Sequence, residues 1–191
     1  MNSFINKELT SGYDIFWGEI APCEHLVQIY TSDDIFLDSL EGFVSGGIQA
    51  GDSVIVIATP GHVSALNQRL TARGFNVETA RSREQYITLD ANETLAKFMV
   101  KGWPDEQLFN KFLADLLART GNKRRVRAFG EMVAILWARG QKMATIRLEE
   151  LWQQLCKKDG LSLFCAYPKS DFTQDTETSI KEICAAHSKL I

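Results

Sequence analysis

The sequence predicts an α/β protein with a mostly parallel sheet flanked by helices on both faces. Short apolar, β-branched runs alternate along the chain with longer amphipathic segments, an order typical of parallel sheets with helical crossovers. One run, 53–58, reads Ser-Val-Ile-Val-Ile-Ala without polar alternation, which indicates a strand buried on both faces. A chain of 191 residues that is 45% hydrophobic is long enough to bury a sizeable core in one domain.

Caps and breakers set the expected ends of the elements. Ser32 is a good N-cap, and Asp33 and Asp34 after it favour the positive end of a helix. Asp90 and Glu93 have the spacing of a capping box. The expected strands cover 25–30, 53–58, 75–77, 86–89, 126–129 and 161–166. The expected helices cover 33–50, 63–73, 90–99, 104–120, 133–139, 143–155 and a last segment that carries Ile180, Ile183, Cys184 and His187.

Composition limits the class of protein and its partners. The net charge is −3 and the basic cluster at 123–127 has no interleaved aromatic residue, so we interpret that cluster as a solvated loop and expect no nucleic-acid partner. The four cysteines form no C-x-x-C pair, which indicates reduced thiols in a cytoplasmic protein. No apolar run approaches the length of about 20 residues that a membrane span needs. We expect an N-terminal arm over 1–24 and a single domain over 25–191.

The segment Thr59-Pro60-Gly61-His62 follows the buried strand, where α/β proteins usually hold ligands. A phosphate-binding loop needs G-x-x-x-x-G-K-[ST], in which the lysine meets phosphate charge and the hydroxyl binds Mg²⁺. Here Gly61 is followed by His-Val-Ser, so the lysine and the hydroxyl residue directly after it are both missing. We therefore expect no ATP hydrolysis. Backbone N–H groups at this helix start still suit an anion or a polar head group, although a plain strand-to-helix turn explains the segment equally well.

Chemically reactive side chains also stand at or near strand ends. Glu131, Cys165 and Tyr167 are expected near the carboxyl ends of parallel strands, on the same rim as Thr59, whereas His25 begins its strand and is expected to lie away from them. A Cys-His-Glu set suits a nucleophile with its base or a thiolate metal site. No local spacing supports either, and a cysteine in an apolar strand is usually a core residue. Glu131 is more suggestive, because a carboxylate in such a turn needs a partner or a ligand, although a helix dipole also stabilises it.

Five segments in one order resemble the MEDS family, the sensory domain named for methanogens, methylotrophs and a dichloromethane-responsive regulator. The resemblance covers about 24–190 and includes the tail motif Ile183-Cys-Ala-Ala-His187. Five blocks in order are far more specific than any single motif. The segments are His25-Leu-Val-Gln-Ile-Tyr30, Gly47-Ile-Gln-Ala-Gly-Asp-Ser-Val-Ile-Val-Ile-Ala-Thr59, Leu89-Asp-Ala-Asn-Glu-Thr-Leu95, Arg127-Ala-Phe-Gly-Glu-Met-Val133 and Cys165-Ala-Tyr-Pro168.

The resemblance implies a RecA-like or clock-ATPase-like core that lacks the lysine of the phosphate loop. It also implies sensing of small molecules, such as hydrocarbon derivatives, with the signal passed to a kinase or a DNA-binding domain. The characteristic His, Glu and Cys-Ala-Tyr residues of the family match His25, Glu131, Cys165 and Tyr167. The sequence ends at Ile191 without an output domain, so either a separate partner reads the state of the domain or the chain is part of a longer protein.

We therefore expect a non-enzymatic sensory domain that binds a small molecule and signals to a protein partner, a kinase or a transcription regulator. We expect no catalytic residue, no cofactor and no metal. The last helix, with Ile180, Ile183 and Cys184, is the expected partner surface, and a homodimer is permitted without being required. The alternatives are a nucleotide-binding RecA-like regulator and a ligand-independent adaptor for a histidine kinase or an anti-sigma system. The expected ligand-binding residues are Thr59, Pro60, Gly61, His62, Glu131, Cys165, Tyr167 and His25.

Overall fold

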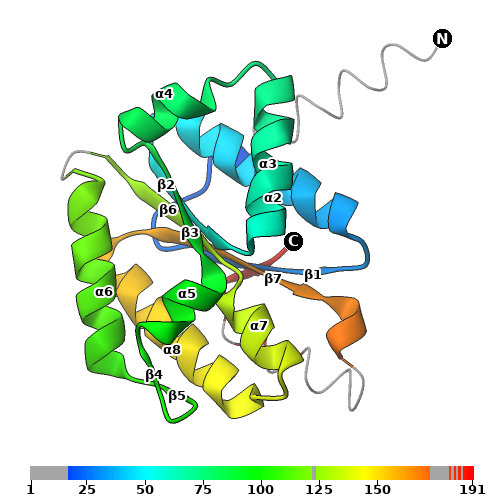
Figure 1. The fold of residues 1–191 in the computed structure, drawn as a ribbon, viewed down its shortest axis with the longest axis vertical. Coiled ribbons are helices and arrows are strands. Elements are labelled where there is room, and N and C mark those ends of the chain that lie inside the picture. Colours follow the sequence, from blue (N-terminus) through cyan, green and yellow to red (C-terminus); the bar gives the residue numbers. More distant parts are fainter. Residues whose placement is uncertain (1–16, 122–123, 173–180, 182, 184, 186) are drawn as a thin grey trace.

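The computed structural model describes residues 17–121, 124–172, 181, 183, 185 and 187–191. Six strands of this part form one parallel sheet in the order β3-β2-β6-β7-β1-β8 (Figure 1). The prediction of a parallel α/β sheet is confirmed. The strands are β1 (His25–Tyr30), β2 (Ser53–Ala58), β3 (Tyr86–Asp90), β6 (Val126–Gly130), β7 (Ser162–Pro168) and β8 (Lys189–Leu190).

Helices cover both faces of this sheet, because alternate residues of each strand point to opposite sides. On one face Leu26 and Phe164 pack with side chains of α2, α3 and α4. On the other face Val27 and Cys165 pack with side chains of α5, α6, α7 and α8. Figure 1 shows these two layers of helices on either side of the sheet. The helices are α2 (Asp33–Gln49), α3 (Pro60–Ala72), α4 (Val77–Ser82), α5 (Ala91–Ala96), α6 (Glu106–Arg119), α7 (Met132–Ala138) and α8 (Lys142–Asp159).

The differences from the expected elements arise where a local cap or a proline decides the backbone. Asn76 accepts the N–H of Thr79 at 2.9 Å and starts α4, so the expected strand at 75–77 is wrong. Helix α3 begins at Pro60 rather than at Val63, because proline at the first helical position loses no intrahelical hydrogen bond. Most of the segment between Thr59 and His62 is therefore the first turn of a helix and not a free turn.

A small antiparallel hairpin replaces the end of one expected helix. Helix α5 stops at Ala96, and β4 (Met99–Val100) then pairs with β5 (Trp103–Pro104). Pro104 thus lies in a strand, whereas the expectation was that it begins a helix. The next helix, α6, begins only after Asp105, whose side chain accepts the N–H of Leu108 at 2.9 Å.

The glycines before β2 allow close packing of α2. A Cβ on Gly46 would lie 2.9 Å from the main-chain carbonyl carbon of Trp17, and one on Gly47 would lie 2.7 Å from a methyl group of β2. Asp52 then accepts the Nε of the buried Arg127 at 2.6 Å. Arg127 also donates to the carbonyl of Trp17. The glycine-rich lead-in to β2 is therefore used for packing, and Arg127 connects Asp52 to the backbone of Trp17.

The last segment contributes to the core. Ile183 is only 1% exposed and packs in the core on the α8 side of the sheet, so the expectation that it offers a partner surface is wrong. Ile180 and Cys184 lie outside the described residues. The chain reaches β8 after a short 3-10 helix, η1 (Lys169–Asp171), which follows β7. Among the described helices, none combines the length and apolar character needed to cross a membrane.

Candidate functional site

The carboxyl ends of β2 and β6 meet where the chain connections diverge. From β2 the chain passes through α3 to β3 on one side, and from β6 it passes through α7 and α8 to β7 on the other (Figure 1). Such a topological switch point is where open α/β sheets hold ligands. The residue after β2 is Thr59 and the residue after β6 is Glu131, so these two residues face each other across the switch point.

The carboxylate of Glu131 bridges this point. Its Oε2 accepts the N–H of Thr59 at 2.8 Å, and its Oε1 lies 2.9 Å from Nδ1 of His62. The Thr59 hydroxyl adds a longer contact of 3.4 Å to Oε1. The side chains of His62 and Glu131 keep 21% and 12% of their surface exposed. We call Thr59, His62 and Glu131 the rim cluster; Pro60 and Gly61 form the helical turn between its members.

The rim cluster combines a charged pair with an aromatic wall. The hydrogen bond to Glu131 raises the pKa of His62 above its ordinary value of 6.5 and outweighs burial, which lowers it. Burial, followed by the charge of Glu131, raises the pKa of Tyr30. The ring of Phe36 stacks on Tyr30 and meets His62 edge-on, with centroid distances of 4.9 Å in both pairs. A polar ligand group would therefore meet the partly exposed His62–Glu131 pair, whereas the aromatic rings beside the pair are buried.

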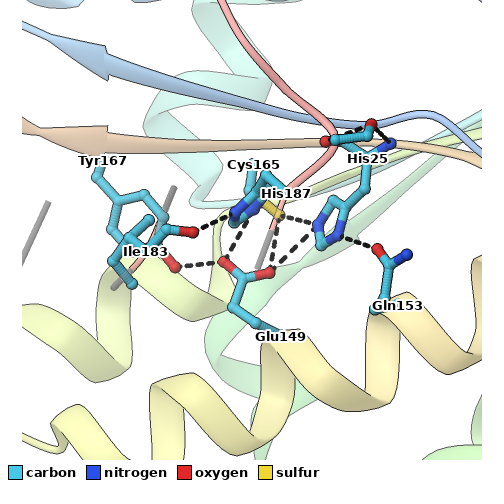
Figure 2. Close-up of polar contacts among 8 residues, drawn as sticks. His25, Glu149, Gln153, Cys165, Tyr167, Ile183 and His187 are labelled. Atoms are coloured by element: carbon cyan, nitrogen blue, oxygen red, sulfur yellow. Dashed lines mark hydrogen bonds and ion pairs between the residues drawn. The ribbon is translucent and has the colours of Figure 1, made fainter. Parts of the chain in front are cut away.

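A second set of titratable side chains lies on the face of the sheet that α5 to α8 cover, between β1, β7 and α8 (Figure 2). Oε2 of Glu149 lies 3.2 Å from Nε2 of His25 and 3.6 Å from Sγ of Cys165. Oε1 of Glu149 lies 3.4 Å from Nε2 of His187 and accepts the hydroxyl of Tyr167. Nε2 of His25 and Sγ of Cys165 are 3.5 Å apart. We call His25, Glu149, Cys165 and His187 the buried cluster.

Charge in the buried cluster is centred on Glu149. Burial would raise the pKa of this carboxyl, but the neighbouring histidines, first His187 and then His25, outweigh it and hold the pKa well below its ordinary range. Burial first, and the charge of Glu149 second, raise the pKa of Cys165 and of Tyr167. The side chains of His25, Glu149 and His187 are fully shielded from solvent, so every charge in this cluster needs a partner within it.

The structure divides the predicted site residues between the two clusters. Cys165 and Tyr167 point to the α8 face and not to the rim beside Thr59, because alternate residues of β7 face opposite sides. The expectation that His25 lies away from Cys165 is wrong. The parallel strands β1 and β7 pair His25 with Leu163, so His25 and Cys165 point to the same side two positions apart and come into contact.

Sequence reasoning missed Glu149 and gave His187 no role. A signal for Glu149 was present, because it lies on a stripe of α8 where Thr145, Trp152 and Cys156 are all buried. A carboxylate on such a stripe must be paired in the interior. His187 carries no comparable local signal, since its place depends on how the last segment returns to the sheet.

A hollow on the surface lies apart from both clusters. It has a volume of about 450 Å³ and lies between α3 and α4, with Asn67, Thr71 and Arg81 among its lining residues. No residue of the rim cluster or the buried cluster lines it. The candidate sites are therefore set by interacting side chains and not by this hollow.

Comparison with known proteins gives the chain a family. The family model described as "MEDS: MEthanogen/methylotroph, DcmR Sensory domain" matches residues 24–188, a range that contains every residue of both clusters. No curated protein sequence gives a match. Because the family model covers most of the chain, the chain belongs to the MEDS family of sensory domains.

Proposed function

We propose that this chain is a non-catalytic sensory domain that binds a small molecule at the rim cluster and passes the signal to a protein partner. Membership of a sensory family supports the general role. The location rests on one observation: the partly exposed Glu131 carboxylate bridges Thr59 and His62 across a topological switch point of the sheet.

The contacts of the rim cluster favour an amphipathic ligand. A ligand acceptor group competes with Glu131 for the N–H of Thr59, whereas a ligand donor group takes the place of His62 on the carboxylate. Behind these groups lie the rings of Tyr30 and Phe36, which are 8% and 1% exposed, so a short hydrocarbon body reaches them by moving these side chains apart. A small hydrocarbon derivative with one hydrogen-bonding group meets both requirements.

The same carboxylate offers a route for the signal. Glu131 directly precedes α7 on one face of the sheet, while Thr59 and His62 belong to the start of α3 on the other face. A ligand that takes over the carboxylate therefore loosens a link between the two helical layers. The β4–β5 hairpin carries two exposed apolar side chains, Val100 and Trp103. They give a partner protein a contact surface.

A thermal-shift screen of small alcohols, amines, carboxylates and halogenated hydrocarbons tests the ligand site. Binding to the native state alone must raise the melting temperature. We expect at least one compound to shift the wild type, to lose its shift in Glu131→Gln, and to keep it in the matched surface control Glu150→Gln. The proposal fails if every active compound shifts Glu131→Gln and His62→Gln as much as the wild type. A shift by ATP that Glu131→Gln leaves unchanged would favour the nucleotide-binding alternative.

A further inference from the structure

His187 presents a buried ring nitrogen without a hydrogen-bond partner. Its Nδ1 lies 2.7 Å from the carbonyl oxygen of Ile183, which can only accept, so Nδ1 carries the proton. In the neutral ring Nε2 then carries a lone pair and can only accept a hydrogen bond. This atom has no hydrogen-bond partner among the described residues. It lies 3.4 Å from Oε1 of Glu149, an ion-pair distance. In the neutral ring two acceptors therefore face each other, and either a proton or a metal ion between them removes this conflict.

His25 is likewise held through its Nδ1. Its Nδ1 lies 2.9 Å from Oε1 of Gln153, one turn of α8 away from Glu149, and its Nε2 points into the buried cluster (Figure 2). Histidines that bind metals usually donate their other N–H to a carbonyl or carboxylate oxygen in this way, and carboxylate ligands are themselves hydrogen-bonded. Here the hydroxyl of Tyr167 donates to Glu149. The cluster thus has oriented ligands and the outer contacts that hold them.

Several contacts between these side chains have the lengths found between neighbouring ligands of a tetrahedral ion. Zinc bonds of about 2.0–2.3 Å place neighbouring ligand atoms about 3.3–3.8 Å apart in a tetrahedron. Nε2 of His25, Sγ of Cys165 and Oε2 of Glu149 are separated by 3.2, 3.5 and 3.6 Å. Nε2 of His187 lies 3.4 Å from the other carboxylate oxygen, Oε1. Within the described chain, one ligand atom from each of the four residues lies within 4.8 Å of all the others.

From this geometry we infer that His25, Glu149, Cys165 and His187 bind a divalent transition-metal ion of the zinc class. A dication, one carboxylate, one thiolate and two neutral imidazoles sum to zero charge, which suits a fully buried site. Binding releases the Cys165 thiol proton to solvent, since the metal ligand is the thiolate. Thiolate and imidazole ligands disfavour Mg²⁺ and Ca²⁺. The inference departs from the expectation of no metal and is independent of the proposed ligand at the rim cluster.

The metal itself is the probe. The full chain is treated with a chelator, dialysed and titrated with Co²⁺, while absorbance is followed in the visible and near-ultraviolet. We expect about one equivalent of Co²⁺ to give the intense visible bands of tetrahedral cobalt and a thiolate-to-cobalt charge-transfer band, and Zn²⁺ to displace both. The absence of these bands in the folded wild type overturns the inference. The alternative is then a protonated His187 paired with Glu149.

Variants assign the ligands. Cys165→Ser is expected to abolish the charge-transfer band, and Glu149→Gln to weaken Co²⁺ binding at least about tenfold. Matched controls are Cys23→Ser, an exposed thiol, and Glu150→Gln, an exposed neighbour on α8; both are expected to bind like the wild type. Circular dichroism confirms that each variant is folded. Wild-type affinity in a folded Cys165→Ser or Glu149→Gln variant, or loss of the band in Cys23→Ser, places the metal elsewhere and overturns the inference.

Discussion

The rim cluster and the buried cluster place the same two groups, a carboxylate and an imidazole, in opposite surroundings. Glu149 has no exposed side-chain surface and contacts two histidines, a tyrosine and a cysteine. Glu131 is partly exposed and contacts one N–H, one hydroxyl and one histidine. A buried charge needs every partner at all times, whereas a rim charge can exchange a partner for water or a ligand. The buried cluster therefore suits a permanently bound group, and the rim cluster suits a ligand that binds and dissociates.

The sharpest test of this contrast is removal of the buried carboxylate. Glu149→Ala is expected to lower the free energy of unfolding by about 3–5 kcal/mol, because it leaves buried polar partners without their acceptor. Denaturant unfolding near neutral pH measures the loss. Glu150→Ala, a change of an exposed carboxylate that pairs with Arg147, is expected to stay within about 0.5 kcal/mol of the wild type. A loss below about 1 kcal/mol in Glu149→Ala would show that the buried cluster is not a stabilising unit.

The corresponding change at the rim should cost less. Glu131→Ala removes the acceptor for the N–H of Thr59 and the partner of His62, but water can reach both groups. We expect a loss of about 1–2 kcal/mol, within the range for hydrogen bonds to charged groups that are partly open to solvent. The same unfolding experiment applies. Equal losses for Glu131→Ala and Glu149→Ala would remove the distinction between the two clusters.

The pH dependence of stability gives a finer comparison at the rim. The folded-state pKa of His62 is raised above 6.5 by Glu131, with a smaller contribution from the charge of Asp33 on α2. The protonated ring therefore stabilises the fold; this contribution is complete below about pH 6.5 and is lost as pH rises through the folded-state pKa. His62→Gln should consequently destabilise the protein more at about pH 5.5 than at about pH 8.5.

An NMR titration of His62 checks the cause of this effect. In the wild type we expect the His62 pKa above its ordinary value of 6.5, and in Glu131→Gln we expect it to fall, because the charged acceptor is gone. A His62 pKa that is unchanged by Glu131→Gln would mean that the pair does not form in solution.

The smallest effect is expected at Thr59. Its backbone N–H makes the short 2.8 Å contact to Glu131, whereas its hydroxyl makes only the 3.4 Å contact. Thr59→Val keeps the N–H and the branched shape, so stability should change by no more than about 0.5 kcal/mol. A larger loss would assign the hydroxyl a stronger contact than the structure gives it.

The two clusters also differ in how far the sequence could predict them. The rim cluster depends on where strands β2 and β6 end, and those ends follow from local signals such as the apolar run 53–58 and Pro60. The buried cluster depends on pairing between strands distant in sequence: His25 and Cys165 are 140 positions apart and meet through the register of β1 and β7. Glu149 could have been suspected from the buried stripe of α8, but its partners could not.

The positions of most strands and helices were predictable because they too follow from local signals. Periodicity and caps locate β1, β2, β3, β6 and β7 to within a few residues, because hydrophobic patterning acts locally. The order β3-β2-β6-β7-β1-β8 was not predictable, since several right-handed arrangements of parallel strands share that pattern. Short elements such as α4 and the β4–β5 hairpin depend on single caps and on packing, which periodicity does not report.

The position of β1 between β7 and β8 has a consequence for how the protein folds during synthesis. This strand leaves the ribosome long before either neighbour, so both its edges stay unpaired until the carboxyl-terminal part of the domain arrives. Parallel pairing over such a distance is slow, because a long loop must close first. The buried cluster takes His25 from the early part of the chain and His187 from the late part. Its completion therefore marks the moment at which the newly made domain has closed.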